Sequence, residues 1–592
     1  MAEPVFRAVR SDDTEHDITE GELYRYTRHR WLYNEAYHLS QRYLKFNLQE
    51  LLKAASIAID VKGFVRCTKI LKCKEGLNNK VFLLTMTNGI EICAKLPHPG
   101  AGPSFYTTAS EVATHHFLRD VLNISTPRII AWSADRNNPV GAEYILEEKA
   151  QGEQLGKLWQ DWHEWPMRAR AGVIEQVVQM EHILASTKFA KSGSIYFRED
   201  IAGSDPLAVI SPMDSTVLER FTIGPLVEHR LWRGERAVMD LNRGPYNDAH
   251  ELVEAIAMNE KKYISLYAHS RMNYARSVTG YEQPKDAIDL LDRYLQLTPA
   301  MVPPKHEADI HSATLWHPDL HLNNVFVDPK SKRINQVIDW QSAAVLPFFH
   351  QCRVPPMFRH PRPIDDDLNT LQKRPGNYKD LNQDEKKQID ILIASEGIHK
   401  YYLGTTHNQN QRHWVALQLK DDLRTQPAHI VPNIWEESNV FYLRRALLRI
   451  VGAWEDLCLD RGPCPVTFTD EELAQHAQEA ENMEAVSGVL TLFRDRWGLP
   501  PDGSVESAGY EEVKAELSQM REAFIEAADN EEDKFLAEKL WPYQDTDERP
   551  KRETSHRGLY KEFKYDIRGK VSEFEAELEF FSGGGKLIWF KR

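Results

Sequence analysis

One hairpin pattern in the second half of the sequence constrains the fold more than any other feature. Two short apolar runs, at residues 325–328 and 334–338, flank a turn-forming segment at residues 329–333. Apolar runs of strand length on either side of such a segment predict a β-hairpin. The hairpin would bring Asn324, directly before the first strand, to the same open end as Asp339, directly after the second. The sequence therefore predicts a site at that end.

The stretch that leads into this hairpin is His317-Pro318-Asp319-Leu320-His321-Leu322-Asn323-Asn324. Asp319 would lie just outside the open end that carries Asn324 and Asp339. Carboxylate and amide oxygens suit Mg²⁺ when phosphates and water complete its shell. We therefore expect Asn324 and Asp339 to be metal ligands and Asp319 to be the catalytic residue that accepts or orients a hydroxyl group. His317 and His321 at this spacing more often cap and pack than bind metal, so no zinc site is predicted.

A second hairpin is predicted nearer the N-terminus, after a strand at residues 64–71. Its strands, at residues 81–86 and 90–95, are separated by Thr87-Asn88-Gly89. Asn-Gly between apolar runs is a strong hairpin signal because both residues tolerate positive φ. With the turn centred on Asn88, Lys95 lies across from Val81. Lys95 is then beside the loop at residues 75–79, which leads into the first of these two strands.

This loop and Lys95 are expected to bind a nucleotide. Gly76 lets the backbone approach phosphates closely, and Asn78 and Asn79 are further candidate contacts in the loop. Residues 110–119 predict a helix, near whose start Glu111 would hold the ammonium group of Lys95. Taken alone, such a pair is more often an ordinary salt bridge. Its place in chain order before the hairpin site favours nucleotide binding.

The polar connector at residues 147–152 is a candidate hinge between two lobes. It follows predicted strands at residues 128–132 and 142–146, and within it Glu147 and Lys149 are expected to be further nucleotide-binding residues. Helical patterns dominate residues 157–299 and return after the hairpin site, which predicts a helical second lobe.

The length of 592 residues exceeds what one hydrophobic core usually serves. We expect an N-terminal helical extension at residues 1–56, a β-rich N-lobe at 57–150, a helical C-lobe with the catalytic loop at 151–495 and a charged C-terminal extension at 496–592. Residues 19–56 are spaced for one or two amphipathic helices, and residues 510–540 for a solvated helix pair. The segments 545–561 and 582–585 are expected to be irregular.

Charge and composition restrict the partners. A net charge of −15 gives no electrostatic reason to bind a nucleic-acid backbone. No apolar run approaches the ~18 residues that a membrane span needs, and no secretory signal opens the chain, so we expect a soluble protein. Six cysteines without zinc-type spacing favour a reducing compartment.

Taken in chain order, these motifs resemble the aminoglycoside phosphotransferase family, and more closely its fungal branch of proteins like altered inheritance of mitochondria protein 9. The resemblance covers about residues 20–480 and is carried by Gly76-Leu77-Asn78-Asn79, Ala94-Lys95-Leu96-Pro97, Ser110-Glu111-Val112-Ala113-Thr114, His317-x-Asp319-Leu320-His321-x-x-Asn324 and Ile338-Asp339-Trp340. It implies an α+β, protein-kinase-like two-lobed fold with ATP as donor and Mg²⁺ as cofactor. Lys95 then resembles the phosphate-binding lysine, Glu111 its partner and Asp319 the catalytic base.

The function predicted from these features is ATP-dependent transfer of the γ-phosphoryl group to a hydroxyl of a small molecule. Pro318 stands where antibiotic kinases usually have glycine, so an antibiotic acceptor is not expected. The alternative is a catalytically silent nucleotide-binding scaffold with the same fold. The resemblance also implies a mitochondrial location, and the acidic N-terminus keeps the cytoplasm as the alternative.

Overall fold

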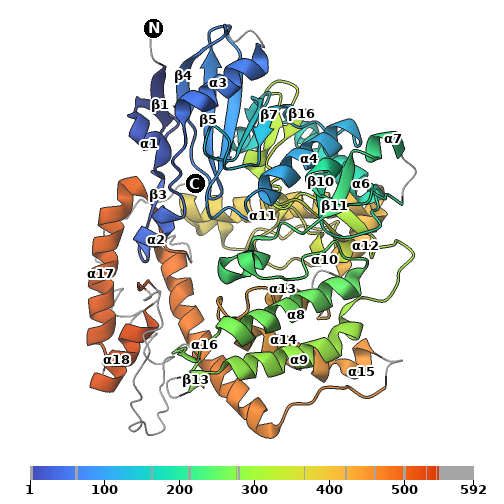
Figure 1. Cartoon of the computed structure of the whole chain (residues 1–592). Helices are drawn as coiled ribbons and strands as arrows, with labels where there is room; N and C mark the ends of the chain where they lie inside the picture. The colour runs from blue at the N-terminus through green and yellow to red at the C-terminus, as the bar shows by residue number, and fades with distance from the viewer. Residues whose placement is uncertain are drawn as a thin grey trace.

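The computed structural model describes residues 4–545 apart from residues 61–63, 160–161, 163–164, 211–214, 275, 278–279, 366, 420–422, 459–461, 498–501, 529 and 542. A sheet-rich lobe lies at the top of Figure 1, in blue, and a larger helical lobe lies below it. The predicted α+β, kinase-like two-lobed fold is confirmed.

The N-lobe is built on a seven-stranded sheet with the order β2-β1-β4-β5-β6-β8-β7. Its neighbours are antiparallel except for β1 and β4, which are parallel. Side chains along β5 alternate between buried and half-buried positions, as expected when one face of a sheet covers a core. The strands are β1 (Val5–Val9), β2 (Glu15–Asp17), β4 (Cys67–Lys72), β5 (Asn79–Met86), β6 (Glu91–Pro97), β7 (Ile129–Ser133) and β8 (Tyr144–Glu148).

The hairpin between β5 and β6 has the predicted register. Lys95 pairs with Val81, and Gly89 in the turn has a φ of 83°. Adjacent residues of β6 therefore serve different faces: Ala94 and Leu96 join the N-lobe core, while Lys95 points to the opposite side.

Two helices pack on opposite faces of this sheet. Helix α3 (Leu48–Ile59) buries Leu48, Leu51 and Ala55 in the N-lobe core. Helix α4 (Tyr106–Asp120) lies on the other face, where Glu111 meets Lys95 and where Phe117 joins the core of the C-lobe. Helix α4 therefore connects the two lobes as well as supporting the sheet.

The prediction of one or two helices at residues 19–56 is only partly right. Helices α1 (Glu20–Tyr24), α2 (Glu35–Ser40) and α3 are present, but the strand β3 (His29–Trp31) lies among them. Trp31 is 1% exposed, and β3 pairs with β18 (Ser504–Glu506) near the other end of the chain. The aromatic spacing thus reflects a long-range strand pair as well as helices.

The C-lobe is mainly helical and contains the largest core of the molecule. Among the described residues, no helix is both long enough and apolar enough to cross a membrane. The helices and strands of the C-lobe are β9 (Glu153–Gln154), α5 (Leu155–Leu158), α6 (Met167–Ser186), β10 (Ser194–Phe197), α7 (Ser215–Leu218), β11 (Phe221–Gly224), α8 (Ala249–Tyr267), β12 (Arg271–Met272), β13 (Tyr281–Glu282), α9 (Pro284–Met301), β14 (Ala313–Trp316), β15 (Val325–Val327), β16 (Ile334–Val337), β17 (Ala344–Pro347), α10 (Phe348–Gln351), α11 (Gln383–Gln409), α12 (Gln411–Gln418), α13 (Gln426–Ile430), α14 (Val440–Gly452), α15 (Trp454–Leu457) and α16 (Asp470–Trp497).

The C-terminal segment packs against the N-terminal one. After β18 come α17 (Tyr510–Glu526) and α18 (Glu531–Leu540), so the predicted helix pair is present. The pair is not solvated all round, because Tyr510 and Leu517 enter a small core that Leu32 and Tyr33 also contact. The irregular segments predicted at 545–561 and 582–585 lie, beyond residue 545, outside the described residues.

Candidate active site

Lys95 is the centre of the site because its ammonium group bonds to two carboxylates. Its Nζ lies 2.6 Å from Oε1 of Glu111 and 2.8 Å from Oδ1 of Asp339. Glu111, whose side chain is 3% exposed, comes from the second turn of α4, whereas Asp339 comes from the C-lobe after β16. The structure thus places Lys95 and Glu111 together, as predicted, and adds Asp339 to the same contact.

The charges in this cluster depend on one another. Burial alone would lower the pKa of Lys95, but Asp339 and Glu111 outweigh it and hold that pKa above its ordinary value. Lys95 in turn lowers the pKa of Asp339, while burial raises the pKa of Glu111 against the pull of Lys95. A charged lysine therefore lies beside an ionised aspartate. These are the charges that phosphate and a metal cation, respectively, require.

The hairpin of β15 and β16 forms as predicted, with Val325 paired to Val337. At its open end the N–H of Ile338 donates to the carbonyl oxygen of Asn324 at 2.9 Å. Asp339 follows with a φ of 64°, a left-handed conformation that is uncommon for a residue other than glycine and is found at functional turns. Asn324 and Asp339 therefore lie at the same end of the hairpin.

His317 fixes the loop that carries Asp319 to this hairpin. Its Nδ1 accepts a hydrogen bond from the N–H of Asp319 at 3.1 Å, and its Nε2 donates to the carbonyl oxygen of Ile338 at 3.0 Å. Burial lowers the pKa of His317, which keeps the ring neutral with its proton on Nε2. The backbone of Asp319 is thereby held next to the residue that precedes Asp339.

Asp319 and Asn324 present oxygen atoms at this end. The Asp319 side chain is 64% exposed, with Oδ2 3.6 Å from Nε2 of His321. Nδ2 of Asn324 donates to the carbonyl oxygen of Asp319 at 2.9 Å. Because this bond uses the amide nitrogen, it leaves the amide oxygen with its capacity to accept a further contact. Asn324 and Asp339 together thus offer the hard oxygen ligands that suit Mg²⁺.

The loop at residues 75–79 is anchored by a buried ion triad that the sequence analysis missed. The carboxylate of Glu75 lies 3.1 Å from Nζ of Lys72 and 2.7 Å from Nζ of Lys80, and all three side chains are at most 2% exposed. Glu75 also accepts a hydrogen bond from the N–H of Thr27 at 2.8 Å. Buried charges need such partners. In the sequence, this triad is visible only as three charged residues, Lys72, Glu75 and Lys80, at the neighbouring ends of the apolar strands β4 and β5.

The three loop residues predicted to contact a nucleotide differ in their surroundings. No described protein atom lies within 4 Å of a Cβ built at Gly76, so the protein itself does not require glycine there. The carbonyl oxygen of Asn78 accepts a hydrogen bond from the N–H of His98 at 2.8 Å. Asn79 exchanges hydrogen bonds with Gln341 at 3.0 and 3.3 Å. Its side chain therefore joins the lobes, and Gln341 is a further residue that the sequence analysis missed.

Glu147 and Lys149 have different positions, and the predicted connector begins later than expected. Strand β8 continues through Glu148, so Glu147 belongs to the sheet, where it pairs with Cys93. Glu147 is on the same face as Lys95, and burial raises its pKa to about 8 although Lys95 opposes this. Nζ of Lys149 lies 2.7 Å from Oε2 of Glu91 at the surface. The structure thus brings Glu147 to the Lys95 cluster but not Lys149.

The contact of Lys95 from the sheet-rich lobe with Asp339 from the helical lobe lies between the two lobes of a kinase-like fold. Two fungal proteins are similar to the chain in sequence. A subtelomeric hrmA-associated cluster protein of Aspergillus fumigatus is 28% identical over 515 residues, which cover 81% of this chain and 98% of that protein. Altered inheritance of mitochondria protein 9 of Candida dubliniensis is 24% identical over 544 residues, which cover 80% of this chain and 83% of that protein. The predicted resemblance to this fungal branch is confirmed.

Solved structures with a similar chain path include the macrolide 2′-phosphotransferase of Brachybacterium faecium. It is 12% identical, with a TM-score of 0.25, and the match covers 65% of this chain and 98% of that protein. No sequence profile of a known family matches the chain.

Proposed function

We propose that the protein transfers the γ-phosphoryl group of ATP to a hydroxyl group of a small molecule. The observation that carries this proposal is the cluster in which one lysine bonds to both Glu111 and Asp339 across the two lobes. A structural ion pair needs one carboxylate. A nucleotide site needs a cation for phosphate, a carboxylate that orients it and a second carboxylate for a metal ion.

Each residue of the cluster then has a defined task. Lys95 binds phosphate oxygens, and Glu111 keeps its ammonium group in place. Asp339 and the amide oxygen of Asn324 would hold Mg²⁺, which neutralises charge on the transferring group when it is bound. Binding exchanges the contact between Lys95 and Asp339 for contacts to phosphate and metal, because these ligands carry the complementary charges.

Asp319 activates the hydroxyl group of the acceptor. Its exposed carboxylate accepts the proton of the attacking hydroxyl, whose oxygen forms the new bond to the γ-phosphorus. The bond between that phosphorus and the β,γ-bridging oxygen breaks, and ADP leaves with the electron pair. His317 contributes by holding the backbone of Asp319 at a fixed position relative to Asp339.

We also propose a mitochondrial location for the protein. The relatives from Candida dubliniensis, Candida albicans and Yarrowia lipolytica carry the word mitochondrial in their names. Imaging of the tagged full chain in fungal cells would test the location. A cytoplasmic signal that excludes mitochondria would contradict it.

The decisive experiment measures ADP release from Mg-ATP with a panel of hydroxylated metabolites, for the wild type and for Asp319→Ala. Loss of the proton acceptor should lower turnover by about 10²-fold or more, with little change in nucleotide binding. Asp289→Ala, which removes a carboxylate from an exposed position of α9, is the matched control and should keep wild-type turnover.

The same experiment separates the enzyme from the scaffold. If the wild type and Asp319→Ala both bind Mg-ATP and neither transfers phosphate to any acceptor, a nucleotide-binding scaffold replaces the proposed enzyme. If neither protein binds Mg-ATP, both functions are wrong.

A further inference from the structure

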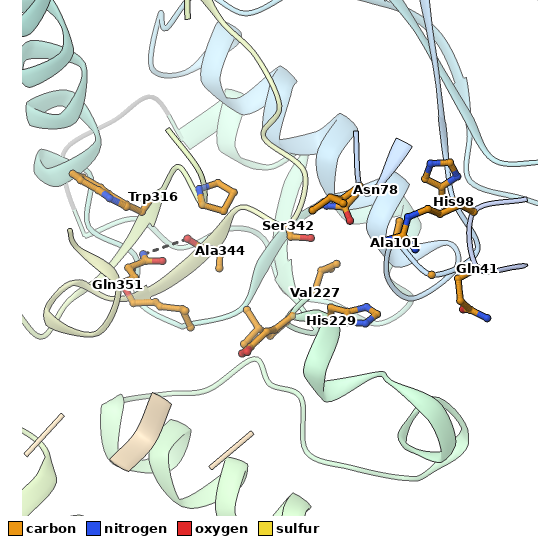
Figure 2. A pocket seen from close by; sticks show the side chains of 17 residues that line it. Gln41, Asn78, His98, Ala101, Val227, His229, Trp316, Ser342, Ala344 and Gln351 are labelled. Carbon is orange, nitrogen blue, oxygen red and sulfur yellow. Dashed lines mark hydrogen bonds between the residues drawn. The ribbon is translucent and has the colours of Figure 1, made fainter. Parts of the chain in front are cut away.

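A cavity of about 550 Å³ adjoins the proposed reaction site. In Figure 2, Trp316, Ala344 and Gln351 lie at one end, and Gln41 and His98 at the other. Its volume is that of sites that bind small molecules. The walls come from both lobes, from the N-terminal extension and from the loop at residues 75–79.

The cavity lies where an acceptor would have to bind. Its wall includes Pro318, which directly precedes Asp319, and Ser342, which lies three residues after Asp339. It also includes Asn78 of the loop, whose carbonyl oxygen accepts the N–H of His98. A molecule in this cavity is therefore next to the residue that precedes the proposed proton acceptor and next to the loop at residues 75–79.

The fixed positive charge in the wall is Arg42. Its guanidinium group lies 4.3 Å from the centre of the Trp31 ring, and its Nη1 donates to the carbonyl oxygen of His38 at 2.9 Å. Its Nε is buried without a hydrogen-bond partner, and in the described part of the chain no carboxylate forms an ion pair with it. Burial lowers the pKa of Arg42 by more than Tyr26 and the carboxylate of Asp502 raise it, so an anion in the cavity would further stabilise the charged guanidinium group.

The negative charge in the wall is already compensated. Glu228 lies 2.5 Å from Nη2 of Arg230. The cavity therefore offers one unpaired cation and no unpaired carboxylate among its described lining residues.

His98 adds an unpartnered polar group. It is 1% exposed, and neither ring nitrogen has a hydrogen-bond partner among the residues that the structure describes. Burial lowers its pKa to about 3, so the ring is neutral and offers one donor and one acceptor. A buried polar side chain without partners is destabilising unless a ligand satisfies it.

We propose that this cavity binds the phosphoryl acceptor, and that the acceptor is a small hydroxylated anion whose carboxylate or phosphate group contacts Arg42. His98 hydrogen-bonds to the anionic group or to a neighbouring hydroxyl, and another hydroxyl reaches Asp319. This inference rests on the proposed function and adds the chemical class of its substrate. The unpaired arginine favours an anionic acceptor over a neutral or cationic one.

The test uses probes with related carbon skeletons, in which an anionic group replaces one neutral group. Binding of glycerol 3-phosphate and glycerate is compared with glycerol, and of glucose 6-phosphate and gluconate with glucose, by calorimetry at constant ionic strength. The full chain is first saturated with Mg²⁺ and a non-hydrolysable ATP analogue, so that nucleotide phosphates already occupy their site. At least one anionic probe should bind with a much higher affinity than the neutral probe it is compared with.

Three variants assign the binding to Arg42. Arg42→Met should lower the affinity for the anionic probe by roughly ten- to a hundredfold, which is the loss expected for a charge-assisted hydrogen bond. Arg42→Lys should recover part of the lost affinity. Lys45→Met removes a positive charge from the same segment outside the cavity and should leave binding unchanged. Melting temperatures check that each variant is folded.

Several results would overturn the inference. These are equal binding of neutral and anionic probes, no probe binding at all, unchanged binding to Arg42→Met, or loss of anion binding once the ATP analogue is present. The last result would mean that Arg42 holds nucleotide phosphate instead. Failure of the analogue to bind counts against the proposed function, and the probes are then titrated without nucleotide, where the comparison of Arg42→Met with Lys45→Met still decides the role of Arg42.

Discussion

At the scale of single residues, Lys95 sets the charge state of its surroundings. It bonds to Glu111 and Asp339, and its charge also opposes the burial that raises the pKa of Glu147 to about 8. Three carboxyl groups thus depend on one ammonium group. Removing it would leave Glu111 buried without its partner, which is the costly way to break a buried pair.

We predict that Lys95→Met lowers the free energy of unfolding by about 3–5 kcal/mol near pH 8 and by less at pH 5. The folded variant would keep a proton on Glu111 that the unfolded chain releases above its ordinary pKa of 4.5. The variant therefore loses stability as the pH rises through this range. Urea unfolding at both pH values measures the effect.

Lys149→Met is the matched control for this prediction. It removes a lysine whose partner, Glu91, lies at the surface, and should change stability by at most about 1 kcal/mol. An equal loss for Lys95→Met at pH 5 and pH 8 would show that Glu111 does not take up a proton.

At the scale of elements, β3 connects the C-terminal segment with the loop at residues 75–79. The hydroxyl of Tyr510 donates to the carbonyl oxygen of Trp31 at 3.1 Å. Directly before β3, Arg28 lies 3.5 Å from Glu506 and donates to the carbonyl oxygen of Glu75 at 3.1 Å. The packing of β18 and α17 thus supports the segment that holds the loop.

Tyr510→Ala should therefore affect the proposed nucleotide site as well as stability. We expect a loss of about 3–5 kcal/mol, the range for deleting a large buried aromatic side chain, together with weaker binding of an ATP analogue. Tyr281→Ala, at a position 50% exposed, should change neither quantity. Lower stability with unchanged nucleotide affinity would mean that the C-terminal segment does not support the loop.

The elements also show which parts of the site the sequence could predict. Both hairpins depend on local turn signals, so the pairing of Lys95 with Val81 and the shared end of Asn324 and Asp339 were predictable. The contact of Asn79 with Gln341 was not, because it joins residues 262 positions apart and leaves no local pattern. The unpaired state of Arg42 depends in the same way on packing that only the folded chain reveals.

At the scale of the whole molecule, the two lobes have separate cores of unequal size. The N-lobe core lies between the sheet and α3, whereas the much larger C-lobe core also includes Phe117 of α4. A small core buries a smaller fraction of the surface of its lobe on folding and therefore stabilises that lobe less than a large core does. The described polar contacts between the lobes include Lys95 with Asp339 and Asn79 with Gln341.

Calorimetry of the full chain should therefore show the N-lobe sheet unfolding at a lower temperature than the C-lobe. A non-hydrolysable ATP analogue with Mg²⁺ should raise the lower transition more than the upper one, since it stabilises the folded site by about 2.7 kcal/mol at a hundredfold excess over its Kd. EDTA added with the analogue is the control and should remove most of the shift. A single transition that moves as a unit would contradict the prediction.

The pairing of β3 with β18 also bears on how the protein is made. Trp31 and Tyr510, which contact each other, are 479 residues apart. At synthesis rates of about 5–20 residues per second, the ribosome makes the partner segment roughly 25 to 95 seconds after β3. During that time its edge and the ring of Trp31 are open to other strands and to chaperones. The loop at residues 75–79, whose support runs through this strand, is thus expected to be among the last parts of the proposed site to mature.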